Sequence, residues 1–113
     1  MNQGITTVVY PVKDIGKAKF LFRKLLGVEP YADTPYYVGF KMGNQDIGLD
    51  PNGHKEGMTP YYHVDDIKKN LQSLEDAGAK IIQEIKDVGG GRLIASVKDE
   101  NGNIIGLIQD QEH

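Results

Sequence analysis

A nine-residue pattern occurs twice in this chain, 52 residues apart, and this repeat constrains the fold more than any single motif. Residues 7–15 read TVVYPVKDI and residues 59–67 read TPYYHVDDI, so Thr, Tyr, Val, Asp and Ile recur at the same five places. Ile-Gly-Leu then occurs at 47–49 and again at 105–107. One copy of such a unit cannot bury its own apolar face. We therefore expect two copies that pack together, with any site forming between them.

The first copy, residues 5–50, reads as strand, helix and three strands. Asp14 is a suitable N-cap, and apolar residues then recur at helical spacing until Gly27. The helical stripe comprises Ile15, Ala18, Phe22 and Leu25, and the strands are expected near 5–12, 28–33, 36–43 and 46–50. A polar, turn-rich connection at residues 51–57 follows.

The second copy, residues 58–109, repeats this order. Asp66 is the expected N-cap and Gly78 the expected end of its helix. The stripe comprises Ile67, Leu71, Leu74 and Ala77, and the strands are expected near 58–64, 80–86, 91–98 and 103–109. The sequence therefore predicts one domain of 113 residues built from two βαβββ modules.

The composition excludes several classes of function. The 113 residues include no cysteine, which removes disulfides, thiol chemistry and Cys-ligated zinc. No apolar run approaches the roughly 18–20 residues that span a bilayer, and residues 1–4 do not resemble the start of a secretory signal. The formal charge of −3, without a basic stripe, argues against nucleic-acid binding. The basic residues of the first helix (Lys17, Lys19, Arg23 and Lys24) are predicted to form a solvated face. We expect a cytoplasmic protein with neither a membrane nor a nucleic acid as partner.

The two modules carry the features of a known superfamily. Val-x-Asp-Ile opens each helix, at residues 12–15 and 64–67, and Asp-x-x-Gly-Asn precedes the last strand at 99–103. Paired βαβββ modules with these motifs resemble the vicinal oxygen chelate superfamily, which includes glyoxalase I, extradiol dioxygenases and the bleomycin-resistance proteins. The resemblance implies an α+β fold in which an open, curved mixed β-sheet encloses a cleft and the helices lie outside. It also implies a homodimer.

Metal enzymes of this superfamily take ligands from four related positions. Carried over to this sequence, these are Thr7 and Thr59 on the first strands and Gly48 and Gly106 on the last. Zinc, nickel or iron sites need nitrogen, thiolate or carboxylate donors, and none of the four residues supplies one. The resemblance therefore implies that the familial metal site is absent, and we expect no metal, no cofactor and no catalytic residue.

Residues with the parity of these positions are candidates for a ligand site in the cleft. Alternation along the strands places Val9 with Thr7, and Tyr61 and His63 with Thr59. Tyrosine offers a flat apolar ring with one hydrogen-bonding end, which suits planar organic ligands. Arg92 follows the Gly89–Gly91 run and could face an anionic group. The predicted ligand-binding set is Thr7, Val9, Tyr37, Phe40, Gly48, Thr59, Tyr61, His63, Arg92 and Gly106.

Three functions remain open at this stage. The first is a metal-free protein of the bleomycin-resistance type, which sequesters a small apolar or aromatic compound in the cleft. The second is a glyoxalase- or dioxygenase-like lyase, isomerase or oxidoreductase with a relocated metal or none, which would use His63, His54 or Asp50 as active groups. His54, with Asp50 and Glu56 nearby in the sequence, could bind a metal at the surface. The third is an accessory interaction module whose own tyrosines fill the cleft.

Overall fold

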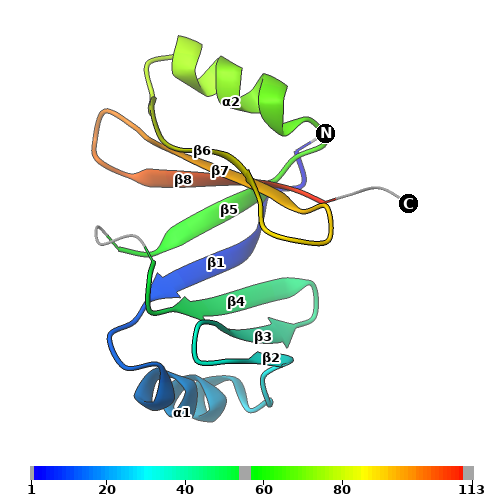
Figure 1. The fold of residues 1–113 in the computed structure, drawn as a ribbon, viewed down its shortest axis with the longest axis vertical. Coiled ribbons are helices and arrows are strands. Elements are labelled where there is room, and N and C mark those ends of the chain that lie inside the picture. Colours follow the sequence, from blue (N-terminus) through cyan, green and yellow to red (C-terminus); the bar gives the residue numbers. More distant parts are fainter. Residues whose placement is uncertain (1, 54–56, 111–113) are drawn as a thin grey trace. The chain divides into compact units, whose positions relative to one another are not determined.

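The computed structural model describes residues 2–53 and 57–110, which form two compact units (Figure 1). The first unit is Thr6–Thr59, and the second combines Met1–Ile5 with Pro60–His113. Each unit contains one helix and a mixed sheet, in the element order β-α-β-β-β. The predicted α+β class with two βαβββ series is confirmed.

The first unit places its helix on one face of a sheet with the order β2-β3-β4-β1. β1 and β4 run parallel, whereas β2–β3 and β3–β4 are antiparallel. The elements are β1 (Ile5–Pro11), α1 (Ile15–Leu26), β2 (Ala32–Asp33), β3 (Val38–Met42) and β4 (Gln45–Asp50).

The second unit repeats this plan with the order β5-β8-β7-β6, in which β5 and β8 are parallel. Its elements are β5 (Thr59–His63), α2 (Ile67–Asp76), β6 (Lys80–Asp87), β7 (Leu93–Lys98) and β8 (Ile104–Gln109). The N-terminal segment also belongs here, because the Gln3 N–H donates to the His63 carbonyl at 2.8 Å and the His63 N–H donates to the Gly4 carbonyl at 3.1 Å. The repeat gave no indication of this pairing.

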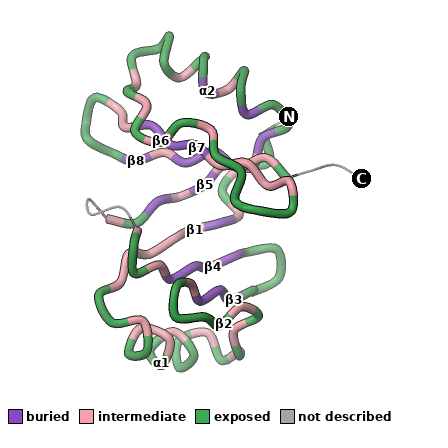
Figure 2. The backbone as a smooth tube through the Cα atoms, viewed as in Figure 1, coloured by how far each residue is buried: buried purple, intermediate pink, exposed green. Residues whose placement is uncertain are grey.

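Each helix covers its own core. Under α1, Phe22 and Leu26 pack with the buried Val38, Phe40 and Leu49. Under α2, the buried side chains come from the helix, from the segment before it and from β7 and β8, and they are Val64, Ile67, Leu71, Ala95, Val97 and Leu107. Figure 2 shows these buried stretches along the central strands. The two helices differ in burial, since α2 buries Ile67 and Leu71 whereas no residue of α1 is fully buried.

The helix ends follow the predicted capping. The Asp14 carboxylate accepts from the Lys17 N–H at 3.1 Å, and the Asp66 carboxylate accepts from the Lys69 N–H at 3.0 Å. Gly27 ends α1 in the left-handed conformation, with φ 72°, and its N–H donates to the Arg23 carbonyl. These contacts satisfy backbone groups that a helix leaves unpaired at its ends.

Two segments differ from, or refine, the sequence expectation. The strand expected over 28–33 contains only Ala32 and Asp33, because Pro30 has no N–H to donate to a neighbouring strand and Val28 joins the α1 core. Gly89, Gly90 and Gly91 all have positive φ, between 64° and 107°, so they form a tight turn that other residues would strain.

The turn between β7 and β8 gives a pH-dependent prediction. Hydrogen bonds from the Asn103 backbone N–H (2.8 Å) and side chain (3.1 Å) lower the pKa of the Asp99 carboxyl, and the Asn101 N–H adds to them. A lowered folded-state pKa means that this contribution to stability is present above the unfolded value, ~3.9, and is lost as the pH falls through the folded value.

Asp99→Asn is therefore expected to remove part of the acid-dependent loss of stability. Urea unfolding from pH 6 down to the acid limit should show a shallower pH dependence in the variant. Glu100→Gln is the matched control, because it removes a neighbouring charge and leaves the hydrogen bonds to the Asp99 carboxylate in place. An equal effect of both substitutions would contradict the role of the Asp99 hydrogen bonds.

Candidate functional site

The face of each sheet opposite its helix carries the positions that align with the superfamily's metal ligands. In the second unit, Tyr61 and Gly106 are paired across β5 and β8. A Cβ placed on Gly106 would lie 2.6 Å from Tyr61 Cε1 and 2.9 Å from Cγ. The Tyr61 ring therefore lies directly over Gly106, and it is only 8% exposed.

The first unit contains a corresponding pair. Gly48 is opposite Val9 on β1 and opposite Gly39 on β3. A Cβ on Gly48 would lie 2.7 Å from Tyr37 Cζ, so the outer end of the Tyr37 ring covers it. In each unit, the glycine thus leaves space that a tyrosine of the same unit occupies.

These four positions do not fit the superfamily's metal. Thr7 and Thr59 are buried and offer neutral hydroxyls, and a carboxylate at Gly48 or Gly106 would collide with a tyrosine ring. Hydroxyls alone do not make a divalent transition-metal site. Within residues 2–53 and 57–110, no group of three or more His, Cys, Asp or Glu side chains is arranged to hold a metal ion.

A second tyrosine of the first unit makes a contact that the sequence did not suggest. The Tyr31 hydroxyl donates to the Asp46 carboxylate at 2.7 Å, and its ring covers Gly39. Asp46 is 7% exposed and lies opposite Thr7, two residues before Gly48. A buried carboxylate needs a hydrogen-bonding partner, which Tyr31 supplies here.

The described part of the second unit contains a pocket of about 450 Å³ where β5 and β8 end and the chain enters α2. Its lining comes from four separate segments and is mostly polar. The lining residues are Gln3, His63, Val64, Asp65, Gly91, Gln109 and Asp110. Pockets that bind small molecules typically measure about 300–1,000 Å³, so this one has a suitable size.

Asp110 organises one wall of this pocket. Its Oδ1 accepts from Arg92 Nε at 2.6 Å, and its Oδ2 lies 3.4 Å from His63 Nδ1. The side chain of His63 is 15% exposed, so its ring is held mostly inside the protein. Gln109 Oε1 accepts from the Ile67 N–H at 2.7 Å, which fixes a second wall against the first turn of α2.

The predicted site residues are placed as follows. His63 lines the pocket, and Arg92 contacts it through Asp110. Tyr37, Gly48, Tyr61 and Gly106 form the covered pairs described above, with Val9 opposite Gly48. Phe40 is 0% exposed and stacks 6.5 Å from Phe22 of α1, so it belongs to the helix-facing core rather than to a ligand site. Its strand parity is that of Val38 and opposite to that of Gly39, which explains this placement.

The candidate residues at the end of β4 and in the loop after it give less support for a site. The Asp50 carboxylate accepts from the Asn52 N–H at 2.7 Å and closes a turn. His54 and Glu56, which were considered with it as ligands of a relocated metal, lie outside the described residues.

Comparison with models of known protein families identifies the superfamily of this chain. Residues 4–107 match the model of the glyoxalase/bleomycin resistance protein/dioxygenase superfamily. The chain belongs to this superfamily. The match covers both βαβββ series, and it confirms the resemblance seen in the repeated motifs. A comparison with curated protein sequences gave no match.

Solved structures share the superfamily's fold at low identity. A superfamily member from Vibrio splendidus 12B01 has 20% identity and a TM-score of 0.74, covering 93% of this chain and 97% of that one. The methylmalonyl-CoA epimerase of Mycobacterium tuberculosis has 16% identity and a TM-score of 0.75, covering 96% and 89%. The Mn(II)-bound glyoxalase from Novosphingobium aromaticivorans has 21% identity and a TM-score of 0.74, covering 95% of this chain and 38% of that one. At these identities the likeness concerns the fold, and function has to be argued from the site.

Proposed function

We propose that this superfamily member binds a small organic molecule, without a metal, in the pocket beside His63 and Asp110. The observation that carries the proposal is the convergence of four segments, three of which contribute polar side chains, around about 450 Å³. Asp110 is held in place by Arg92, and Gln109 by the backbone of α2. Pre-positioned polar groups of this kind give a binding site its specificity.

The charges of the lining indicate the class of ligand. Asp65 and Asp110 contribute two carboxylates, and the nearest guanidinium, that of Arg92, already donates to Asp110. Carboxylates accept strong hydrogen bonds from charged donors. We therefore expect a molecule with an amine or amide group, which changes the earlier expectation of an apolar or aromatic ligand. Homodimerisation and a cytoplasmic location stay predictions.

The proposal of binding without a metal rests on the two glycines that tyrosine rings cover. Because Tyr37 and Tyr61 occupy the space above Gly48 and Gly106, the carboxylates of the superfamily's metal enzymes have no counterpart here. Binding is therefore assigned to hydrogen bonds and burial alone.

The test is a titration of the protein with a panel of small primary amines, amides and carboxylic acids. Binding is monitored through the amide chemical shifts of the protein in its NMR spectrum. Amines and amides are expected to shift the signals of Val64, Gly91 and Gln109. Asp110→Asn should weaken the best binder about tenfold or more, since hydrogen bonds to a charged group are worth about 1.5–3 kcal/mol. Asp76→Asn, on the far end of α2, is the matched control and should leave the affinity unchanged.

Two results would contradict the proposal. Preferential binding of carboxylic acids would mean that Arg92, and not Asp110, governs the pocket. A saturable rise of the melting temperature with Mn²⁺, Ni²⁺ or Zn²⁺ at one ion per chain would show a metal site, because tight binding to the folded state stabilises it.

A second candidate function is an accessory interaction module. It is favoured by the burial of Tyr61, whose ring fills the space over Gly106 and leaves 8% of the residue exposed. The same titration separates the two candidates, because an interaction module would bind no member of the panel.

A further inference from the structure

The outward face of α1 carries three large apolar side chains that the fold does not use. Phe20, Leu21 and Leu25 are 61%, 63% and 71% exposed. With Lys17 and Lys24 they follow the i, i+3, i+4, i+7, i+8 spacing that puts side chains on one face of a helix. We call these five residues the outer stripe. The core-facing side of α1 is a different one, formed by Ala18, Phe22 and Leu26.

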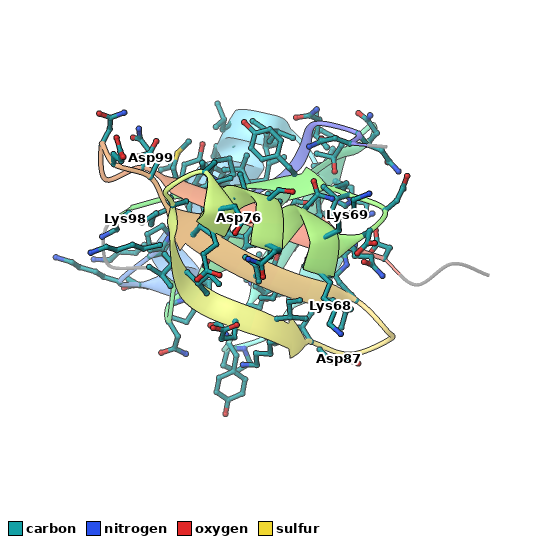
Figure 3. The ribbon with its side chains drawn as sticks, turned by 90° about the horizontal axis from the view of Figure 1, so that it is seen from above. Lys68, Lys69, Asp76, Asp87, Lys98 and Asp99 are labelled. Carbon is teal, nitrogen blue, oxygen red and sulfur yellow. The ribbon has the colours of Figure 1, made fainter. Side chains whose placement is uncertain are left out.

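The internal repeat provides a control for this stripe. At the 52-residue offset, α2 and its C-cap carry Lys69, Gln72, Ser73, Asp76 and Ala77 in the same five places. Figure 3 shows Lys69 and Asp76 at opposite ends of α2. A helix of this architecture therefore needs no large apolar residue on its outward face. The apolar side chains of the outer stripe are specific to α1, and an exposed apolar patch of this kind marks a site of interaction.

The charges around the outer stripe indicate what it contacts. Lys19 pairs with Asp33 and Arg23 pairs with Glu29, both at 2.9 Å. Lys17 and Lys24 have no carboxylate within 4.0 Å among the described residues. Lys24 Nζ instead lies 5.5 Å from the centre of the Phe20 ring. Residues 13–33 hold five basic and three acidic side chains, a net charge of +2 in a chain whose net charge is −3.

An anionic partner that also accepts apolar side chains would match both the lysines and the apolar residues of the outer stripe. A second copy that docked through the same stripe would bring its own unneutralised lysines, which oppose association. An amphipathic helix with apolar residues between lysines is the usual form of attachment to an anionic lipid surface. A lipid interface also adapts to a convex helix, whereas a protein partner needs a matching groove. None of the helices in the described residues is long and apolar enough to cross a membrane.

We propose that the outer stripe of α1 attaches this protein to anionic lipid surfaces. Phe20, Leu21 and Leu25 insert below the headgroups, and Lys17 and Lys24 contact the lipid phosphates. This inference is independent of the ligand pocket in the second unit and goes beyond the proposed function. It departs from the expectation, based on composition, that no membrane is a partner.

The test uses vesicles of phosphatidylcholine, alone or mixed with phosphatidylglycerol, and measures the co-sedimenting fraction of the full chain. Binding is expected to the mixed vesicles only, and to weaken as salt is added, because salt screens the lysines. The triple variant Phe20→Gln/Leu21→Ser/Leu25→Ala carries the residues of α2 at these places. It should retain the wild-type circular dichroism spectrum and bind at least about tenfold more weakly, since burial of apolar side chains drives interfacial binding.

A charge-matched pair completes the test. Lys17→Gln/Lys24→Gln should lower the affinity about thirtyfold, since each lysine near an anionic surface contributes about 1 kcal/mol. Lys68→Gln/Lys69→Gln removes the same charge from α2, whose lysines Figure 3 marks, and should have little effect. Failure to bind mixed vesicles, or equal losses in both double variants, would overturn the proposal. The proposal would also be overturned if, without vesicles, the wild-type protein were a dimer and the triple variant a monomer. The stripe would then be a contact between protein chains.

Discussion

Phe40→Ala is expected to lower the free energy of unfolding by about 3–5 kcal/mol, the usual cost of removing a buried phenylalanine. Phe40 is fully buried in the first unit, where its ring stacks against Phe22. Val38 and Leu49, which belong to the same core, are buried as well. Urea unfolding followed by circular dichroism measures the loss. Faster hydrogen exchange of α1 amides should accompany it, because the apolar side of α1 packs on this core.

The matched control is Phe20→Ala, which makes the same chemical change on α1. Phe20 is 61% exposed and lies on the outward face, so the change should stay within about 0.5 kcal/mol, as for most surface substitutions. Equal effects of the two substitutions would show that Phe40 does not lie in the α1 core. Phe40 would then return to the list of candidate ligand-binding residues.

The elements of the fold could be predicted because several local signals agree. Asp14 and Asp66 cap the helices as their position before an apolar stripe indicates, and Gly27 ends α1. The exception is the strand expected after Gly27, which is reduced to Ala32–Asp33 because Pro30 has no N–H to donate to a neighbouring strand. The pairing of residues 3 and 4 with β5 was also missed, because the repeat begins only at residue 7 and carries no information on the segment before it.

The candidate site could be predicted only in part. Strand parity correctly placed Tyr61 and Gly106 on one face, because side chains alternate along a strand. It could not indicate that the Tyr61 ring lies over Gly106, since that depends on side-chain direction and register. The same alternation should have excluded Phe40, which has the parity of Leu49 across the β3–β4 ladder and not that of Gly48. Asp110 was missed because it follows the last strand, in a segment that reads as a polar tail.

Gly106→Ala is expected to destabilise the protein by about 1–3 kcal/mol, the usual cost of forcing extra volume into a packed position. The new Cβ would meet Tyr61 at Cε1 (2.6 Å) and Cγ (2.9 Å). Cγ lies next to the backbone, so the ring cannot swing aside without moving β5. Gly106 itself is held between β5 and β7, through its pairing with Tyr61 and Ser96. In a Tyr61→Ala background, the same glycine substitution should cost almost nothing. The coupling between the two positions should therefore reach about 1–3 kcal/mol, as found for residues in direct contact.

The Gly48 and Tyr37 pair is the matched control for this cycle. There the added Cβ would meet Cζ, at the outer end of the Tyr37 ring, and Tyr37 itself precedes β3 rather than lying within it. The ring can turn away, so Gly48→Ala should cost less than Gly106→Ala, and its coupling with Tyr37→Ala should be smaller. Additive effects of Gly106→Ala and Tyr61→Ala, measured by urea unfolding of the four proteins in the cycle, would show that the ring does not cover Gly106. The space for a carboxylate at this superfamily position would then be open, and metal independence would lose its structural basis.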